Sequence, residues 1–201
     1  MISAIIFDLE GTVCPDNSRE IIRGLSLPTD PEPLYSKMLA SKPLYECMKG
    51  KISFKDFKRE FADIAKLDIE TIDSLLQGLM GKRHVDKEII NLSDMLKEKK
   101  VSSVVHSDSM KVPFDFWVKR FSLRSHFDHL LCSAYMGTLK SQIETFYNIQ
   151  RYLSEEPSRI VYIDSRESNI YTAEKAGFDT IRFTGAGDLI KKLEKKGIIF
   201  G

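Results

Sequence analysis

The stretch MISAIIFDLEGT, residues 1–12, decides how the rest of the chain is interpreted. Ile2 to Phe7 is almost continuously apolar and rich in β-branched side chains, which is typical of a central strand in a parallel sheet covered by helices. Ligands of such sheets bind outside the carboxyl ends of the strands, which is where Asp8 and Glu10 fall, and Gly11 allows a tight turn beside them. Taken alone, an Asp that merely caps the next segment explains the stretch equally well.

Length, charge and cysteine content exclude several classes of protein. The 201 residues suit one domain or a core with a modest insertion. Lys and Arg number 30 against 29 for Asp and Glu, and the net charge of +1 argues against nucleic acid or a membrane surface as a partner. Cys14, Cys47 and Cys132 form no C-x-x-C pair, which indicates reduced thiols and a cytoplasmic protein. No stretch predicts a membrane span or a secretory signal.

A helical insertion is expected after the first strand. Ser53 and Asp68 are suitable N-cap residues for two amphipathic helices, and no strand pattern occurs before residue 81. We therefore expect a catalytic core of residues 1–13 and 82–201 and a helical cap of residues 14–81.

Helices and strands alternate from Asp86 onward. Further strands are expected at 101–105, 129–132, 159–163 and 180–183. Helices are expected at 87–99, around 114–121, and at 141–153, 168–176 and 188–195. Alternating units with short connections predict an α/β fold, a doubly wound, Rossmann-like parallel sheet with right-handed crossovers.

Polar residues gather at the ends of the predicted strands. The first strand leads to Asp8 and Glu10, the second to Ser107 and Asp108, and the fourth to Asp164. Because parallel strands end at the same edge of a sheet, these groups should converge. Nearby candidates are Lys140, Ser165, Glu167 and Asn169. Carboxylates, a hydroxyl and an ammonium near a divalent cation suit phosphoryl transfer, because cations and donors overcome the repulsion between a phosphate and an attacking carboxylate.

Four motifs in order resemble those of the haloacid dehalogenase (HAD) superfamily of hydrolases. IIFDLEGTV resembles the first motif, D-x-D-G-T, and VVHSDS the second, a strand ending in Ser or Thr. GTLKSQIETFYNI resembles the third, G-x-x-K-P, and IVYIDSRESNIYTAEKAGFDTIRF the fourth. YECMKGKISFKDF resembles the cap of the subfamily that includes sugar-phosphate and FMN phosphatases and the phosphatase domain of soluble epoxide hydrolase.

The resemblance implies a role for each candidate residue. Asp8 would attack phosphorus and become a transient aspartyl phosphate, and Glu10 would protonate the leaving oxygen and then activate water. Mg²⁺ would be bound by the Asp8 side chain, the Glu10 backbone carbonyl and Asp164. The phosphoryl group would be held by Thr12, Ser107, Asp108 and Lys140. The residues supporting the metal site from outside would be Ser165, Glu167 and Asn169.

Three positions depart from the family pattern. Glu10 replaces the usual second Asp, and its extra methylene moves the acid by about 1.5 Å, enough to matter for proton transfer. Ser141 replaces a common proline, a minor change. Ser165 stands where a second acid usually binds the metal, so either Asp164 serves as the ligand or metal binding is weak.

Three hypotheses follow. The first is a Mg²⁺-dependent phosphatase acting on a small phosphorylated metabolite, with the cap choosing the leaving group. The second is a metal-independent haloacid dehalogenase in which Asp8 attacks carbon; Ser165 favours it and Glu10 does not. The third is a retired HAD-like protein that acts by binding. His106, beside the second motif, is expected to pack locally. The sequence indicates neither the physiological substrate nor the oligomeric state.

Overall fold

The computed structural model describes residues 1–198, so the last three residues of the predicted core lie outside the described part. Five parallel strands form one sheet in the order β3-β2-β1-β4-β5. The strands are β1 (Ala4–Asp8), β2 (Ser102–Ser107), β3 (His129–Cys132), β4 (Ile160–Asp164) and β5 (Asp179–Arg182). The order runs outward in both directions from the central β1, which confirms the predicted doubly wound α/β fold.

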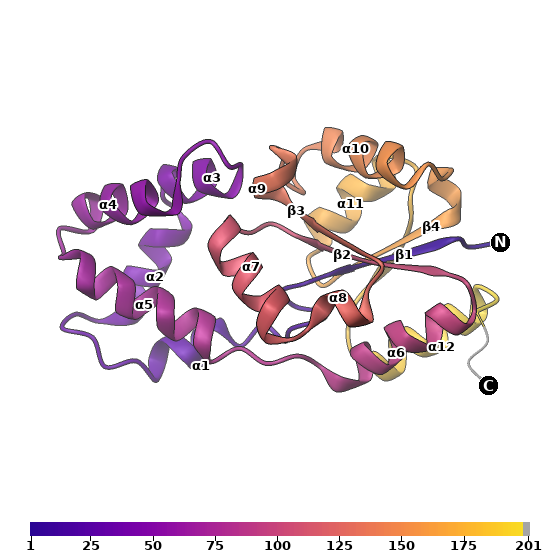
Figure 1. Ribbon diagram of the computed structural model, residues 1–201, viewed down its shortest axis with the longest axis horizontal. Coiled ribbons are helices and arrows are strands. Elements are labelled where there is room, and N and C mark those ends of the chain that lie inside the picture. The colour runs from indigo at the N-terminus through magenta and orange to yellow at the C-terminus, as the bar shows by residue number, and fades with distance from the viewer. Residues whose placement is uncertain (199–201) are drawn as a thin grey trace.

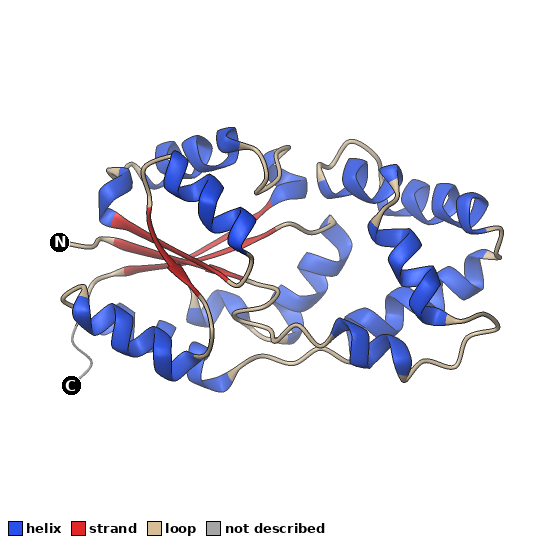
Figure 2. Cartoon of the chain, turned by 180° about the vertical axis from the view of Figure 1, so that it is seen from behind, coloured by secondary structure: helices blue, strands red, loops and turns tan. Residues whose placement is uncertain are grey.

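Two helical layers cover the sheet, as Figures 1 and 2 show. On one face lie α6 (Lys87–Glu98), α7 (Lys111–Arg120), α8 (Leu123–His126) and α12 (Ala186–Lys195). On the other face lie α10 (Ile143–Leu153) and α11 (Glu167–Lys175). The short segments α9 (Ser133–Met136) and η1 (Pro157–Arg159) are connections. Neither α8 nor α9 was expected from the sequence, because four-residue helices leave no helical periodicity to detect.

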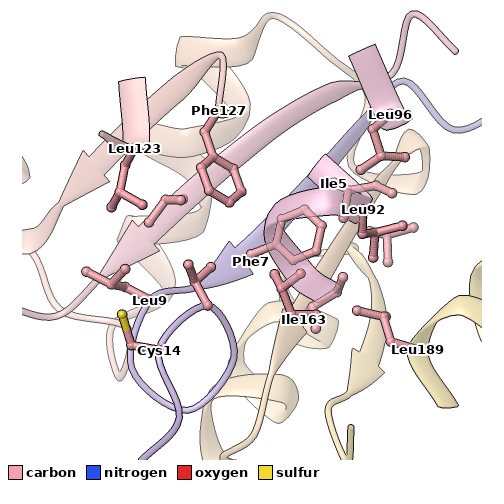
Figure 3. Close-up of a cluster of buried hydrophobic side chains, with 14 of the residues drawn as sticks. Ile5, Phe7, Leu9, Cys14, Leu92, Leu96, Leu123, Phe127, Ile163 and Leu189 are labelled. Carbon is pink, nitrogen blue, oxygen red and sulfur yellow. The ribbon is translucent and has the colours of Figure 1, made fainter. Parts of the chain in front are cut away.

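The apolar first strand is at the centre of the core because its side chains alternate between the two layers. Ile5 and Phe7 pack against the α6 and α12 side, where Figure 3 shows them among leucines and Phe127. Ala4 and Ile6 pack against the α10 and α11 side. Burying each large side chain stabilises the fold by about 1.5–3 kcal/mol. This packing fixes the carboxyl end of β1.

The segment after β1 is helical throughout and lies beyond one end of the sheet (Figure 1). It comprises α1 (Ser18–Arg23), α2 (Pro31–Leu39), α3 (Lys42–Met48), α4 (Phe54–Ala65) and α5 (Ile69–Gly81). Ser53 and Asp68 cap α4 and α5 by accepting hydrogen bonds from backbone N–H groups, as predicted. These helices share a hydrophobic cluster in which the Phe57 and Phe61 rings stack at 6.0 Å. The boundaries of this cap, 14–81, stay a prediction.

No helix in residues 1–198 has the length and apolar character needed to cross a lipid bilayer. The three cysteines are buried and form no disulfide within the described residues.

Candidate active site

The carboxyl ends of β1 and β4 and the loop before α10 bring three charged side chains together. The Lys140 ammonium contacts Oδ1 of Asp8 and lies 3.1 Å from Oδ2 of Asp164. Asp8 ends β1 and Asp164 ends β4, and these strands are hydrogen-bonded neighbours. All three side chains are almost completely buried. The strand-end pattern predicted that these groups would lie close together, but not that the ammonium would lie between the two carboxylates.

Burial and mutual charge set the protonation of this triad. Burial raises the pKa of Asp8 to about 7, with the Lys140 ammonium acting in the opposite direction. Burial alone would lower the pKa of Lys140, but the carboxylates of Asp8 and Asp164 outweigh it and hold that pKa well above its usual value. Burial would likewise raise the pKa of Asp164, yet Lys140 and several hydrogen bonds keep it below its usual value. Lys140 is therefore a fixed cation beside Asp8.

Asp164 is engaged at both of its carboxylate oxygens. Oδ2 accepts from Lys140 Nζ at 3.1 Å, Tyr162 OH at 3.0 Å and Asn169 Nδ2 at 2.9 Å. Oδ1 accepts from the Arg166 N–H at 2.8 Å. The structure therefore places Asp164 as the holder of Lys140, with Asn169 supporting it. Glu167 lies elsewhere: its side chain is 82% exposed and faces Arg182 at 3.6 Å.

Of the other residues predicted to bind phosphate, Asp108 contacts the backbone of Lys140, and Thr12 and Ser107 are buried after β1 and at the end of β2. The hydroxyls of Thr12 and Ser107 are buried, and neither has a hydrogen-bond partner among residues 1–198. A buried hydroxyl without a partner is costly, but neither side chain lines the cavity that adjoins Asp8. Asp108 accepts the backbone N–H of Lys140 at 3.1 Å, and burial raises its pKa. Asp108 thus helps to fix the loop that carries Lys140.

Glu10 lines the same cavity as Asp8 and pairs with a residue that the sequence analysis missed. Its Oε1 lies 2.6 Å from Nη2 of Arg83, a side chain that is only 5% exposed. Arg83 also donates to Ser18 Oγ and lies over the ring of Trp117. Arg83 was missed because it follows the last cap helix in a segment without a motif.

A cavity of about 800 Å³ opens above the triad. Its floor includes Asp8, Lys140 and Asp108, and its sides include Arg83 and Arg166. The cap contributes apolar side chains from three helices, including Met38, Leu44, Met48, Leu76 and Leu79. The cap also contributes charged side chains to the lining, namely Asp16, Arg19, Glu20 and Arg23.

The residues fit a Mg²⁺ ion bound through a single carboxylate. In residues 1–198 no three His, Cys, Asp or Glu side chains are grouped to hold a metal. Mg²⁺ nevertheless binds through one or two carboxylates, substrate phosphate and water. Asp8 is a carboxylate that lines the cavity, and the Glu10 carbonyl follows it by two residues. The turn that carries these groups needs glycine at position 11. Gly11 has a φ of 106°, and a Cβ atom there would collide with the Ser165 hydroxyl.

Comparison with known proteins gives distant relatives. A scan against protein-family models finds no match. Bifunctional epoxide hydrolase 2 of Rattus norvegicus is 24% identical and that of Mus musculus 25% identical, each over 94% of this chain. The chain spans only 38% of the length of these curated relatives.

Solved structures share the whole architecture. A HAD-like family hydrolase from Porphyromonas gingivalis matches with a TM-score of 0.81 and 21% identity over all of both chains. A HAD family enzyme from Bacteroides thetaiotaomicron, in complex with magnesium and inorganic phosphate, has a TM-score of 0.71 and 16% identity over 90% of this chain and 93% of its own. L-2-haloacid dehalogenase from Xanthobacter autotrophicus has a TM-score of 0.69 and 16% identity over 100% of this chain and 85% of its own. The fold is that of the HAD-like hydrolases.

Proposed function

We propose that this HAD-like fold carries a Mg²⁺-dependent phosphatase that hydrolyses a small phosphomonoester through a phosphorylated Asp8. The observation that carries the proposal is the Lys140 ammonium, buried between Asp8 and Asp164 at the floor of the cavity. A fixed cation beside a carboxylate offsets the repulsion between that carboxylate and a phosphate dianion.

Each step of the reaction uses a group of this chain. A carboxylate oxygen of Asp8 forms a bond to phosphorus while the ester oxygen leaves and takes a proton from Glu10. Water then attacks the aspartyl phosphate, gives its proton to Glu10, and releases phosphate and a free Asp8 carboxylate. Lys140 stays charged throughout. Mg²⁺, held by Asp8 and the Glu10 carbonyl, would supply further positive charge near the phosphoryl oxygens.

The unpaired cysteines and the size of the cavity fit a cytoplasmic enzyme that acts on small metabolites. All three thiols are buried and unpaired in the described residues, as suits a reducing compartment. The cavity of about 800 Å³ has the size of a small-molecule site.

A metal-independent dehalogenase is the second candidate, favoured by Ser165 in place of an acid and by the dehalogenase among the structural matches. In that reaction Asp8 would attack carbon and displace halide, and Glu10 would have no proton to transfer.

Phosphate release from phenyl phosphate, measured with Mg²⁺ and with a chelator, tests the proposal against halide release from 2-chloropropionate. We expect metal-dependent phosphate release that falls by about 10³-fold or more in Asp8→Asn. Asp16→Asn is the matched control, because Asp16 lines the same cavity from an exposed position. Turnover that survives in Asp8→Asn contradicts the mechanism. Halide release that the chelator leaves intact favours the dehalogenase, and no turnover of either substrate favours the retired, binding protein.

A further inference from the structure

The Glu10 side chain has more freedom than its backbone. The Gly11 N–H donates to the Cys14 carbonyl at 2.7 Å, and the Cys14 N–H donates to the Leu9 carbonyl at 2.7 Å. These hydrogen bonds fix the turn on both sides of Glu10, but they do not reach its carboxylate. A glutamate side chain also has one more rotatable bond than the aspartate of the family pattern. For proton transfer at a defined place, a further contact must restrict these bonds.

Arg83 provides this contact from the segment that returns the chain from the cap to the core, between α5 and α6. That segment lies beside the turn, because the Asp86 N–H donates to the Val13 carbonyl at 2.8 Å. Nη2 of Arg83 lies 2.6 Å from Oε1 of Glu10. The ion pair therefore joins the Glu10 side chain to a part of the chain outside its own turn.

Arg83 is itself held in place by two further elements. Its side chain is only 5% exposed, and Nη2 donates to the Ser18 hydroxyl of α1 at 3.0 Å. Its Cζ lies 4.9 Å from the centre of the Trp117 ring of α7, within the range of a cation–π contact. A buried guanidinium with these contacts is a fixed point against which the Glu10 carboxylate is held.

The ion pair leaves Glu10 open to the cavity. The Glu10 side chain is 25% exposed and lines the same cavity as Asp8. Water in the cavity can therefore reach the carboxylate that Arg83 holds. An ion pair contains glutamate in its carboxylate form, and this is the form that accepts a proton from water.

We propose that Arg83 is a positioning residue for the second half of the reaction: it holds the Glu10 carboxylate while that carboxylate takes the proton of the attacking water. The proposal rests on the proposed phosphatase function. In this step the water oxygen forms a bond to phosphorus, the bond between phosphorus and Asp8 breaks, and the water proton passes to Glu10. Arg83 acts through Glu10 and exchanges no proton.

4-Nitrophenyl phosphate separates the two halves of the reaction, because 4-nitrophenolate leaves without taking a proton. After rapid mixing with saturating Mg²⁺, phosphorylation of Asp8 gives a burst of nitrophenolate, and hydrolysis of the aspartyl phosphate gives the steady rate that follows. Arg83→Met has a side chain of similar length without the charge. We expect its steady rate to fall by about tenfold or more and its burst to approach the concentration of the chain, while kcat/KM changes by less than about threefold.

Arg59→Met is the control variant. Arg59 is exposed, and its Nη2 lies 2.6 Å from Oδ1 of Asp56 on α4, away from the cavity lining. The variant removes an ion pair of the same separation without touching Glu10 and should keep the wild-type kinetics. Arg83→Lys keeps the charge on a different head group, so its steady rate should lie between those of the wild type and Arg83→Met.

Glu10→Gln shows whether Arg83 acts through Glu10. Because this substitution removes the base, adding Arg83→Met to it should change the steady rate by less than about threefold. Two losses that multiply would mean that Arg83 acts independently of Glu10, and they would overturn the proposal. If Arg83→Met fails to fold, Arg83→Lys decides in its place: it should slow the steady rate when Glu10 is present and not when Gln replaces it.

The failure of this proposal differs from the failure of the proposed function. An Arg83→Met variant with the wild-type steady rate overturns the positioning role and leaves the phosphatase standing. Equal losses of kcat and kcat/KM also overturn it, because Arg83 would then support phosphorylation of Asp8 or the fold as a whole. A wild type that releases no phosphate contradicts the proposed function, and the role of Arg83 falls with it.

Discussion

Two buried cations face the cavity, and they are held in opposite ways. Lys140 is fixed by two carboxylates at the ends of adjacent strands, and one of these, Asp164, accepts three further hydrogen bonds. Arg83 is fixed by one carboxylate and by contacts on both sides of the junction between cap and core, and two of its nitrogens have no partner in the described chain. The first network leaves no atom of Lys140 or Asp164 among the unpartnered buried groups of the described residues, whereas the second leaves Nε and Nη1 of Arg83 there.

Removing the positive charge should therefore lower the free energy of unfolding far more at Lys140 than at Arg83. Lys140→Met leaves the buried carboxylates of Asp8 and Asp164 facing each other, and we expect a loss of about 3–5 kcal/mol in the free energy of unfolding. Phosphate release should disappear as well. Arg83→Met should cost less, because the Glu10 side chain is 25% exposed and water can reach it. Urea unfolding of both variants gives the comparison.

Lys175→Met is the control for the first variant, since Lys175 is an exposed lysine of α11. An Arg83→Met variant that is destabilised as strongly as Lys140→Met would show that Arg83 is a structural ion-pair partner. The distinction between the two cations would then fail.

The Lys140 network was largely predictable from the sequence, because it follows from strand ends. Each residue of the triad lies at or near the end of an apolar strand or in a recognisable motif, and parallel strands end at one edge. What the sequence did not predict is the contact between Asp164 and Lys140; the expected role of Asp164 as a metal ligand stays a prediction. Its four hydrogen-bond donors depend on side-chain directions that a linear motif does not contain.

The Arg83 network was not predictable, because nothing in its local sequence distinguishes it. The pairing with Glu10 joins a loop after β1 to the segment after α5, and the contact with Trp117 adds a helix from the core. Such a contact depends on where the cap lies on the core. Glu10 itself gave the one relevant clue, since the longer side chain reaches a partner outside the triad.

The positive charge of Lys140 should also appear in the pH dependence of stability, through His106. Burial, reinforced by the Lys140 ammonium, holds the pKa of His106 well below its usual 6.5, and its ring packs locally against Phe146 and Tyr162 as expected. Folded His106 is neutral, whereas the unfolded chain binds a proton below about pH 6.5. Stability is therefore lost as pH falls, by about 2 kcal/mol between pH 8 and pH 5.

His106→Phe should remove this part of the pH dependence, because phenylalanine fills the same aromatic site without titrating. The free energy of unfolding, measured at several pH values, checks it. The same substitution at the exposed His84 is the control. An unchanged slope in His106→Phe would mean that groups other than His106 carry the acid sensitivity.

The smallest expected effect tests whether Lys140 is held by more contacts than it needs. Tyr162→Phe removes one of the four donors to Asp164 and should cost about 1 kcal/mol of stability. Because Lys140 keeps both of its carboxylates, kcat for phenyl phosphate should change by no more than about threefold, or about 0.7 kcal/mol. Tyr171→Phe, at an exposed tyrosine of α11, is the control. A much larger loss of kcat would show that Asp164 positions Lys140 only when all four donors are present. The Lys140 network would then tolerate the loss of a single contact no better than the network around Arg83.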